Sequence, residues 1–240
     1  RYAWLPGADA MVPNEQVRDS YDVVIVVDGD RHRLHPVIAK VFAGAEARVI
    51  IDHHLSTRPV GYELSLIVPE AASTCDLVVA LLEDWQLELE QDVATVLYTG
   101  LIFDTGGFRH PNTAPATFHL AARLIATGID HSAISIRVLH ERRASGMWLL
   151  GKALASATIS GELAWSALRL SDIEAAGGVY ADIEGIVDQL LLTEGVELAC
   201  LFVERAPKKV KLSLRSRARV DVSRLARVLD RGGRNLRPQS

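Results

Sequence analysis

Residues 48–57 read RVIIDHHLST, an apolar stretch that stops on three side chains able to bind metals or protons. Residues 48–51 have the composition of a buried strand, and Asp52, His53 and His54 follow without a spacer. Burying one carboxylate and two imidazoles costs free energy and does not improve the packing of an apolar core. Their position at a strand end therefore indicates a metal site.

A second apolar run precedes this one in the chain. Residues 22–28 read DVVIVVD, and residues 37–44, between the two runs, have helical spacing and end on a glycine. Strand, helix and strand in this order predict a βαβ unit of a parallel sheet. Ligands of such sheets bind beyond the carboxyl ends of the strands, so we expect Asp28 to lie beside the triplet 52–54.

A third acid follows a helical segment. Helices are predicted over residues 75–85, 90–103 and 114–127, and Asp104 stands directly after the second of them. The turn Thr-Gly-Gly after Asp104 could let its carboxylate reach the strand ends. Carboxylates with imidazoles, in the absence of thiolates, suit Mn²⁺ or a similar divalent ion. His54 and Arg109 would then be free for phosphate oxygens, Arg109 through its bidentate fork.

Each of these residues, taken alone, also has an ordinary structural explanation. A single aspartate at a strand end is more often a turn or cap residue than a ligand. A single histidine is more often a hydrogen-bonded neutral imidazole, and Thr-Gly-Gly is usually only a turn. The adjacent triplet is what favours the metal site.

The predicted fold class is α/β, with a parallel-sheet domain joined by a helical connector to a smaller α+β domain. The parallel sheet would lie within residues 1–130, the connector within 131–157 and the second domain within 158–240. Short alternating strands near 162–170, 196–203 and 210–215, with a helix over 182–192, predict a second sheet with one exposed face.

Charge is distributed unevenly along the 240 residues. Residues 205–240 carry twelve Lys or Arg against two acids, whereas the chain as a whole has a net charge of −4. This asymmetry suggests a metal-handling part and an anion-binding part, although a solvated basic strand and helix explains the charge equally well. No apolar run approaches the about 18 residues of a membrane span. Two distant cysteines suit a reducing cytoplasm.

The motifs resemble the DHH phosphoesterase superfamily, whose signature triplet would be Asp52-His53-His54. The resemblance extends over nearly the whole chain and favours the nanoRNase/pAp-phosphatase branch, which has a DHH-associated C-terminal domain. The further matching segments are VVD at residues 26–28, PEAAST at 69–74, GLIFDTGGFRH at 100–110, DIEGIV at 182–187 and LSLRS at 212–216.

The resemblance implies Mn²⁺-dependent hydrolysis of very short RNA, of 3′-phosphoadenosine 5′-phosphate (pAp), or of linear and cyclic dinucleotides. His53 would bind metal beside Asp28 and Asp104, and Asp52 would orient the site. The resemblance also implies that His54 and Arg109 contact the scissile phosphate. Substrate binding is implied for Ser73, Thr74, Arg215 and Arg234. A homodimer is a possible assembly.

Two parts of the family pattern have no counterpart here. The first motif, a strand followed by His and two Asp ligands, is not found, and residues 230–240 keep two glycines of a Gly-rich segment without its His. We therefore expect a truncated member of reduced activity, with residues 22–28 as an exposed apolar edge of the sheet.

Two alternatives remain open. A catalytically inactive nucleotide-binding remnant would keep the basic C-terminal part without the chemistry. An exonuclease for longer single strands would need aromatic stacking platforms, and an aromatic content of 6% disfavours it.

Overall fold

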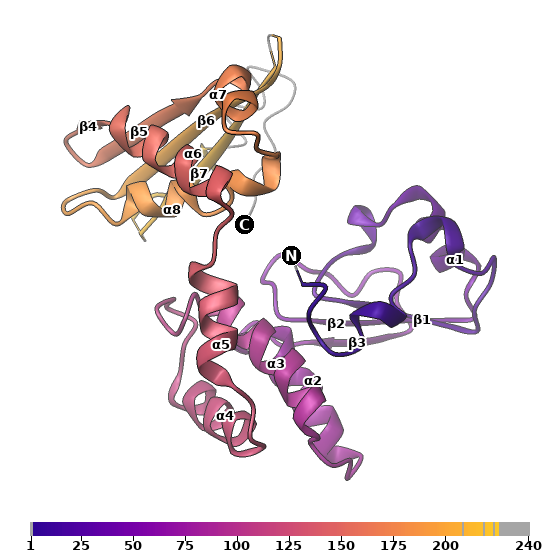
Figure 1. Cartoon of the computed structure of the whole chain (residues 1–240). Coiled ribbons are helices and arrows are strands. Elements are labelled where there is room, and N and C mark those ends of the chain that lie inside the picture. Colours follow the sequence, from indigo (N-terminus) through magenta and orange to yellow (C-terminus); the bar gives the residue numbers. More distant parts are fainter. Residues whose placement is uncertain (1, 208, 218, 223, 226–240) are drawn as a thin grey trace. The chain divides into compact units, whose positions relative to one another are not determined.

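A computed structural model describes residues 2–207, 209–217, 219–222 and 224–225 of the chain. The chain forms two compact units, Arg1–Glu141 and Arg142–Ser240 (Figure 1). The segment predicted as a connector, residues 131–157, is shared between them. Helix α5 (His131–Ser135) and the π-helical turn η4 (Ile136–His140) belong to the first unit, and α6 (Ala144–Ala155) begins the second.

The first unit contains a parallel sheet in the order β1-β2-β3. Its strands are β1 (Val23–Val27), β2 (Ala47–Asp52) and β3 (Leu64–Ile67), and α1 (Pro36–Gly44) connects the first two. Two of the strands lie where the apolar runs predict them, whereas four-residue β3 was not predicted. The predicted α/β architecture, with a parallel sheet and a second separate sheet, is confirmed.

The two faces of β1 differ in burial. Val26 packs inward at 7% exposure, beside fully buried Ile50 of β2. Val23, Ile25 and Val27 point the other way and are 51–55% exposed. Within the described part of the chain β1 pairs with β2 alone, so it is an apolar edge strand there.

Helices build the core of the first unit beside the sheet. Helix α3 (Gln91–Asp104) contacts α2 (Thr74–Asp84), α4 (Pro115–Ala126) and α5, as the magenta part of Figure 1 shows. Leu101 and Leu124 are fully buried at the centre of this cluster. Short 3-10 helices η1 (Ala8–Ala10), η2 (Asn14–Gln16) and η3 (Arg31–Arg33) complete the unit.

The second unit has a mixed sheet in the order β4-β5-β6-β7. Its strands are β4 (Thr158–Ser160), β5 (Leu163–Leu168), β6 (Leu198–Ala206) and β7 (Lys209–Ser216), with β5 and β6 parallel and the other pairs antiparallel. Trp165 and Phe202 meet edge-to-face on its exposed side.

Helices α6, α7 (Leu170–Ala175) and α8 (Ile186–Leu191) pack with this sheet. The single helix predicted over residues 182–192 is confirmed only over Ile186–Leu191, where α8 lies. Gly185 has a φ of +75°, outside the helical range, and separates α8 from the 3-10 helix η5 (Tyr180–Ile183). No described helix is both long and apolar enough to cross a membrane.

Candidate metal centre

Three elements of the first unit deliver acids to one place. Parallel pairing aligns the ends of β1 and β2, and the Asp28 N–H donates to the Ile51 carbonyl at 3.0 Å. Asp28 has a φ of +56°, the left-handed conformation that Asp tolerates better than most residues. Asp52 is the last residue of β2, and Asp104 is the last residue of α3.

The His53 imidazole is oriented by the main chain. Its Nδ1 lies 3.2 Å from the Ala71 carbonyl oxygen, which can only accept, so Nδ1 carries the proton and donates. Its Nε2 then faces two carboxylates, 3.6 Å from Asp28 Oδ1 and 3.9 Å from Asp104 Oδ2. An unprotonated Nε2 would place its lone pair between two carboxylates, an unfavourable arrangement that a cation among them relieves. A histidine whose other nitrogen bonds a carbonyl is the usual arrangement of a metal ligand.

His54 lies at the same cluster. One potential ligand atom from each of Asp28, His53 and His54 falls within 4.8 Å of the others. The two imidazole rings are 4.8 Å apart, centroid to centroid. The group therefore offers nitrogen and oxygen ligands together, a donor set that fits a borderline divalent ion.

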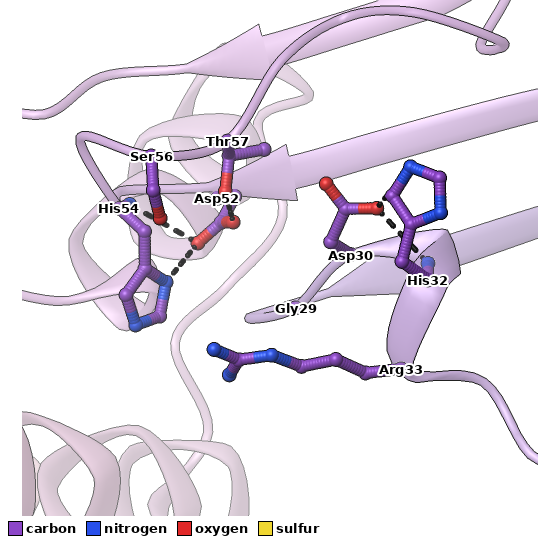
Figure 2. A pocket seen from close by; sticks show the side chains of 8 residues that line it. All are labelled: Gly29, Asp30, His32, Arg33, Asp52, His54, Ser56 and Thr57. Atoms are coloured by element: carbon purple, nitrogen blue, oxygen red, sulfur yellow. Dashed lines mark hydrogen bonds and ion pairs between the residues drawn. The ribbon is translucent and has the colours of Figure 1, made fainter. Parts of the chain in front are cut away.

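Asp52 lies behind the histidines and is fully buried. Its Oδ1 accepts hydrogen bonds from His53 N at 2.7 Å, His54 N at 3.2 Å and His54 Nδ1 at 2.6 Å, while Oδ2 accepts from Thr57 Oγ1 at 2.5 Å. Figure 2 shows the carboxylate between His54 and Thr57. Burial alone would raise the pKa of Asp52, but the bonds from Thr57 and His54 outweigh it and hold that pKa below its ordinary value.

Asp104 is in the opposite electrostatic situation. Burial and the neighbouring Asp28 carboxylate raise the pKa of Asp104 to about 6, against the smaller opposing effect of the two histidines. The loop after Asp104 is held by a side-chain hydrogen bond, because His110 Nδ1 bonds the Asp104 carbonyl oxygen at 2.9 Å. Asn112 Nδ2 donates to the Ala72 carbonyl at 2.7 Å and so ties this loop to the segment before α2.

The other predicted site residues lie in different settings. Thr74 is buried and its Oγ1 donates to Asp28 Oδ1 at 2.8 Å. Ser73 is also buried, with its hydroxyl 3.3 Å from Asp76 Oδ1. Exposed Arg109 donates from Nε to the Gly106 carbonyl at 2.7 Å.

Two predicted substrate residues belong to the C-terminal part of the chain. Arg215 on β7 forms an ion pair with Asp188 of α8, with its Nε 3.1 Å from Oδ1. Arg234 lies outside the residues that the structure describes.

Sequence reasoning missed several residues that support the site. Thr57 could have been predicted from the sequence, because a hydroxyl five residues after Asp52 in the same loop can donate a hydrogen bond to its carboxylate. The Ala71 carbonyl carries no side-chain signal, and Asn112 acts across forty residues on another carbonyl. These main-chain partners become visible only once the fold brings the segments together.

Comparison with known proteins finds one matching family and several relatives. Residues 3–101 match the family described as "DHH family, N-terminal domain". A Thermus thermophilus protein, "Bifunctional oligoribonuclease and PAP phosphatase NrnA", is 31% identical over 184 residues, which is 76% of this chain and 55% of that protein. The match thus spans little more than half the length of that relative.

Two more distant similarities cover more of the chain. The Bacillus subtilis protein of the same name is 24% identical, over 93% of this chain and 71% of that protein. A crystal structure of an exopolyphosphatase-related protein from Bacteroides fragilis superposes with a TM-score of 0.87 at 24% identity, over 94% of this chain and 69% of that one. At this identity the superposition shows a shared fold.

Proposed function

Because the chain belongs to the DHH phosphoesterase family, we propose that it is a metal-dependent hydrolase of phosphoester bonds in very short nucleotides. The substrates we propose are short RNA, pAp and linear or cyclic dinucleotides. The observation that carries the proposal is the His53 imidazole, oriented by the Ala71 carbonyl so that Nε2 faces Asp28 and Asp104.

The residues we assign to the ion are Asp28, His53 and Asp104, with Mn²⁺ as the expected metal. Lewis-acid polarisation of a phosphoryl oxygen is the chemistry that such a divalent ion supplies when bound. Thr74 donates to Asp28 and fixes the direction of that carboxylate. We therefore assign Thr74 to positioning a ligand, and buried Ser73 to the α2 N-terminus, in place of the substrate contacts expected from the sequence.

His54 and Arg109 are the residues we assign to the phosphate under attack. Asp52 accepts from His54 Nδ1, which leaves His54 Nε2 for the substrate or the ion. Arg109 is exposed and needs only to exchange the Gly106 carbonyl for a phosphate oxygen. In the second unit Arg215 and Arg234 are proposed substrate contacts. Free thiols at Cys75 and Cys200 agree with a proposed cytoplasmic location.

A second candidate is nucleotide binding without turnover. In the described residues a single group of Asp and His side chains could hold an ion, whereas hydrolysis by paired ions about 3.5–4 Å apart needs two sets of ligands. We therefore propose that these 240 residues hydrolyse their nucleotide substrate slowly. Binding of the nucleotide without any hydrolysis is the extreme case.

The test is release of AMP from the dinucleotide pApA by the 240-residue chain, with Mn²⁺ or with EDTA. We expect Mn²⁺-dependent turnover that His53→Gln lowers by about 100-fold or more, beyond the 10- to 100-fold typical of residues that only orient ligands. His119→Gln, which changes an exposed histidine on α4, is the matched control. Equal rates for the two variants would overturn the assignment of His53, and calorimetric binding of pApA without cleavage would favour the second candidate.

A further inference from the structure

A cavity opens beside the candidate metal centre and shares His54 with it. Its volume is about 210 Å³, and it is lined by Gly29, Asp30, His32, Arg33, Asp52, His54, Ser56 and Thr57. Pockets for drug-sized ligands measure about 300–1,000 Å³, so this one suits a single small group. It is formed by the loops that follow β1 and β2, and His54 belongs both to its wall and to the metal centre.

The acids of this cavity are already engaged. Both oxygens of Asp52 accept hydrogen bonds from Thr57 and from the two histidine residues. Asp30 caps the 3-10 helix η3 by accepting from His32 N at 3.0 Å, and its Oδ1 lies 3.9 Å from His32 Nε2. The carboxylates therefore have partners within the protein, and the cavity does not resemble a second cation site.

Arg33 brings a positive charge to the lining of the cavity. Among the described residues its guanidinium has no hydrogen bond or ion pair. Figure 2 shows the side chain extended from η3 toward the side where the His54 ring lies. Arg48, by contrast, is fixed by Glu63. An unpaired guanidinium that lines a small cavity is suited to a phosphate, which it can bind through two parallel N–H donors.

We propose that Arg33 binds a phosphate of the substrate other than the one that is cleaved. This inference rests on the proposed function, because His54 is assigned there to the scissile phosphate. Adjacent phosphates of a short nucleotide are one sugar apart, and His54 is the wall shared by the two positions. Arg33 would thus make the enzyme prefer nucleotides that carry a terminal phosphate next to the scissile bond.

The test compares two dinucleotides that differ in one group, pApA with a 5′-phosphate and ApA without it. Arg33→Gln should lower kcat/KM for pApA by about 10- to 100-fold, the loss of a charge-assisted contact. The change should fall mainly on KM, and cleavage of ApA should be unaffected. Arg33→Lys should restore part of the preference, because it keeps the charge without the fork. Lys40→Gln, which removes an exposed charge of α1 outside the cavity, should change neither substrate.

Equal losses with both dinucleotides, or no loss with either, would overturn the role of Arg33. If the wild-type chain cleaves neither compound, the proposed function fails, and binding then decides the inference separately. Calorimetry in EDTA should show that the wild type binds pApA more tightly than ApA, and that Arg33→Gln removes this difference. Equal affinities of wild type and Arg33→Gln for pApA would overturn the inference whatever the activity.

Discussion

The Asp52 carboxylate connects the sequence motif to the geometry of the site. It is fully buried, and both of its oxygens accept hydrogen bonds from residues 53, 54 and 57. A buried carboxylate of this kind is stable only while its partners remain. Asp52 therefore holds the histidines in place, and Thr57 and His54 keep Asp52 ionised.

Asp52→Asn should destabilise the metal-free protein by about 2–4 kcal/mol. The amide nitrogen would face donors, so at least one buried group would lose its partner. Urea unfolding in EDTA measures the change. Thr57→Val removes only one of the hydrogen bonds to Asp52 and should cost about 1 kcal/mol. Equal costs for the two substitutions would contradict the central position given to Asp52.

Asp182 gives the second unit its own pH dependence. Its side chain accepts from Val179 N and Ser145 Oγ, both at 2.8 Å, and lies 3.3 Å from Arg143 Nη1. Burial opposes ionisation, but these partners outweigh it and hold the pKa of Asp182 below its ordinary 3.8. Because the folded pKa is depressed, the stabilisation is complete above pH 3.8 and is lost as pH falls through the lower folded pKa.

Asp182→Asn should therefore cost about 1.5–3 kcal/mol at pH 7, the value of hydrogen bonds to a charged group. The difference between wild type and variant should shrink progressively as pH falls below 3.8, because Asp182 is then protonated first in the unfolded chain and, at its lower pKa, in the folded protein. Denaturant unfolding at pH 7 and pH 3 checks this. A difference that stays constant across this range would mean that the charge of Asp182 contributes nothing.

At the scale of elements, the parts that sequence patterns predict are those with a local cause. The β-branched runs before Asp28 and Asp52 specify buried strands, and helical spacing specifies α1 to α4. Strand β3 is too short for a periodic signal, and its pairing with β2 is non-local. The break at Gly185 required knowledge that its φ is positive.

The same distinction applies to the site. Asp28, Asp52 and Asp104 stand at element ends that a pattern reveals. The carbonyl that orients His53 belongs to Ala71, eighteen residues away, and carries no mark in the sequence. The unpaired state of Arg33 likewise depends on which acids the fold has already paired, so it required the structure.

Close packing of α2 on α3 depends on Gly100. A Cβ at this position would overlap Cys75 Sγ, and burial raises the pKa of that thiol to about 12, so it packs as a neutral group. Gly100→Ala should cost about 1–3 kcal/mol through overpacking, although alanine is the better helix former.

Shortening the opposing side chain should reverse this effect. In the background of Cys75→Ala the change Gly100→Ala should become neutral or stabilising, by up to about 1 kcal/mol. Thermal unfolding of the two single variants and the double variant forms the cycle. Additive costs would contradict direct contact between the two positions.

At the scale of the whole molecule, the two units differ in chemistry. The first holds the group of Asp28, His53 and His54, and the second carries the basic strand β7. Burial, together with nearby Arg205 and Arg215, lowers the pKa of Lys211 on this strand. The first unit thus offers candidate ligands for a cation, and the second offers cationic side chains on β7.

The central claim is that Asp28, His53 and Asp104 hold a divalent ion, and calorimetric titration of the metal-free protein with Mn²⁺ tests it most directly. Wild type and His119→Gln should bind the ion with the same affinity. His53→Gln and Asp104→Asn should weaken binding by about 100-fold or more, above the effect of removing a residue that only orients a ligand. Circular dichroism establishes that each variant is folded. A folded His53→Gln protein that binds Mn²⁺ as tightly as His119→Gln would contradict the account.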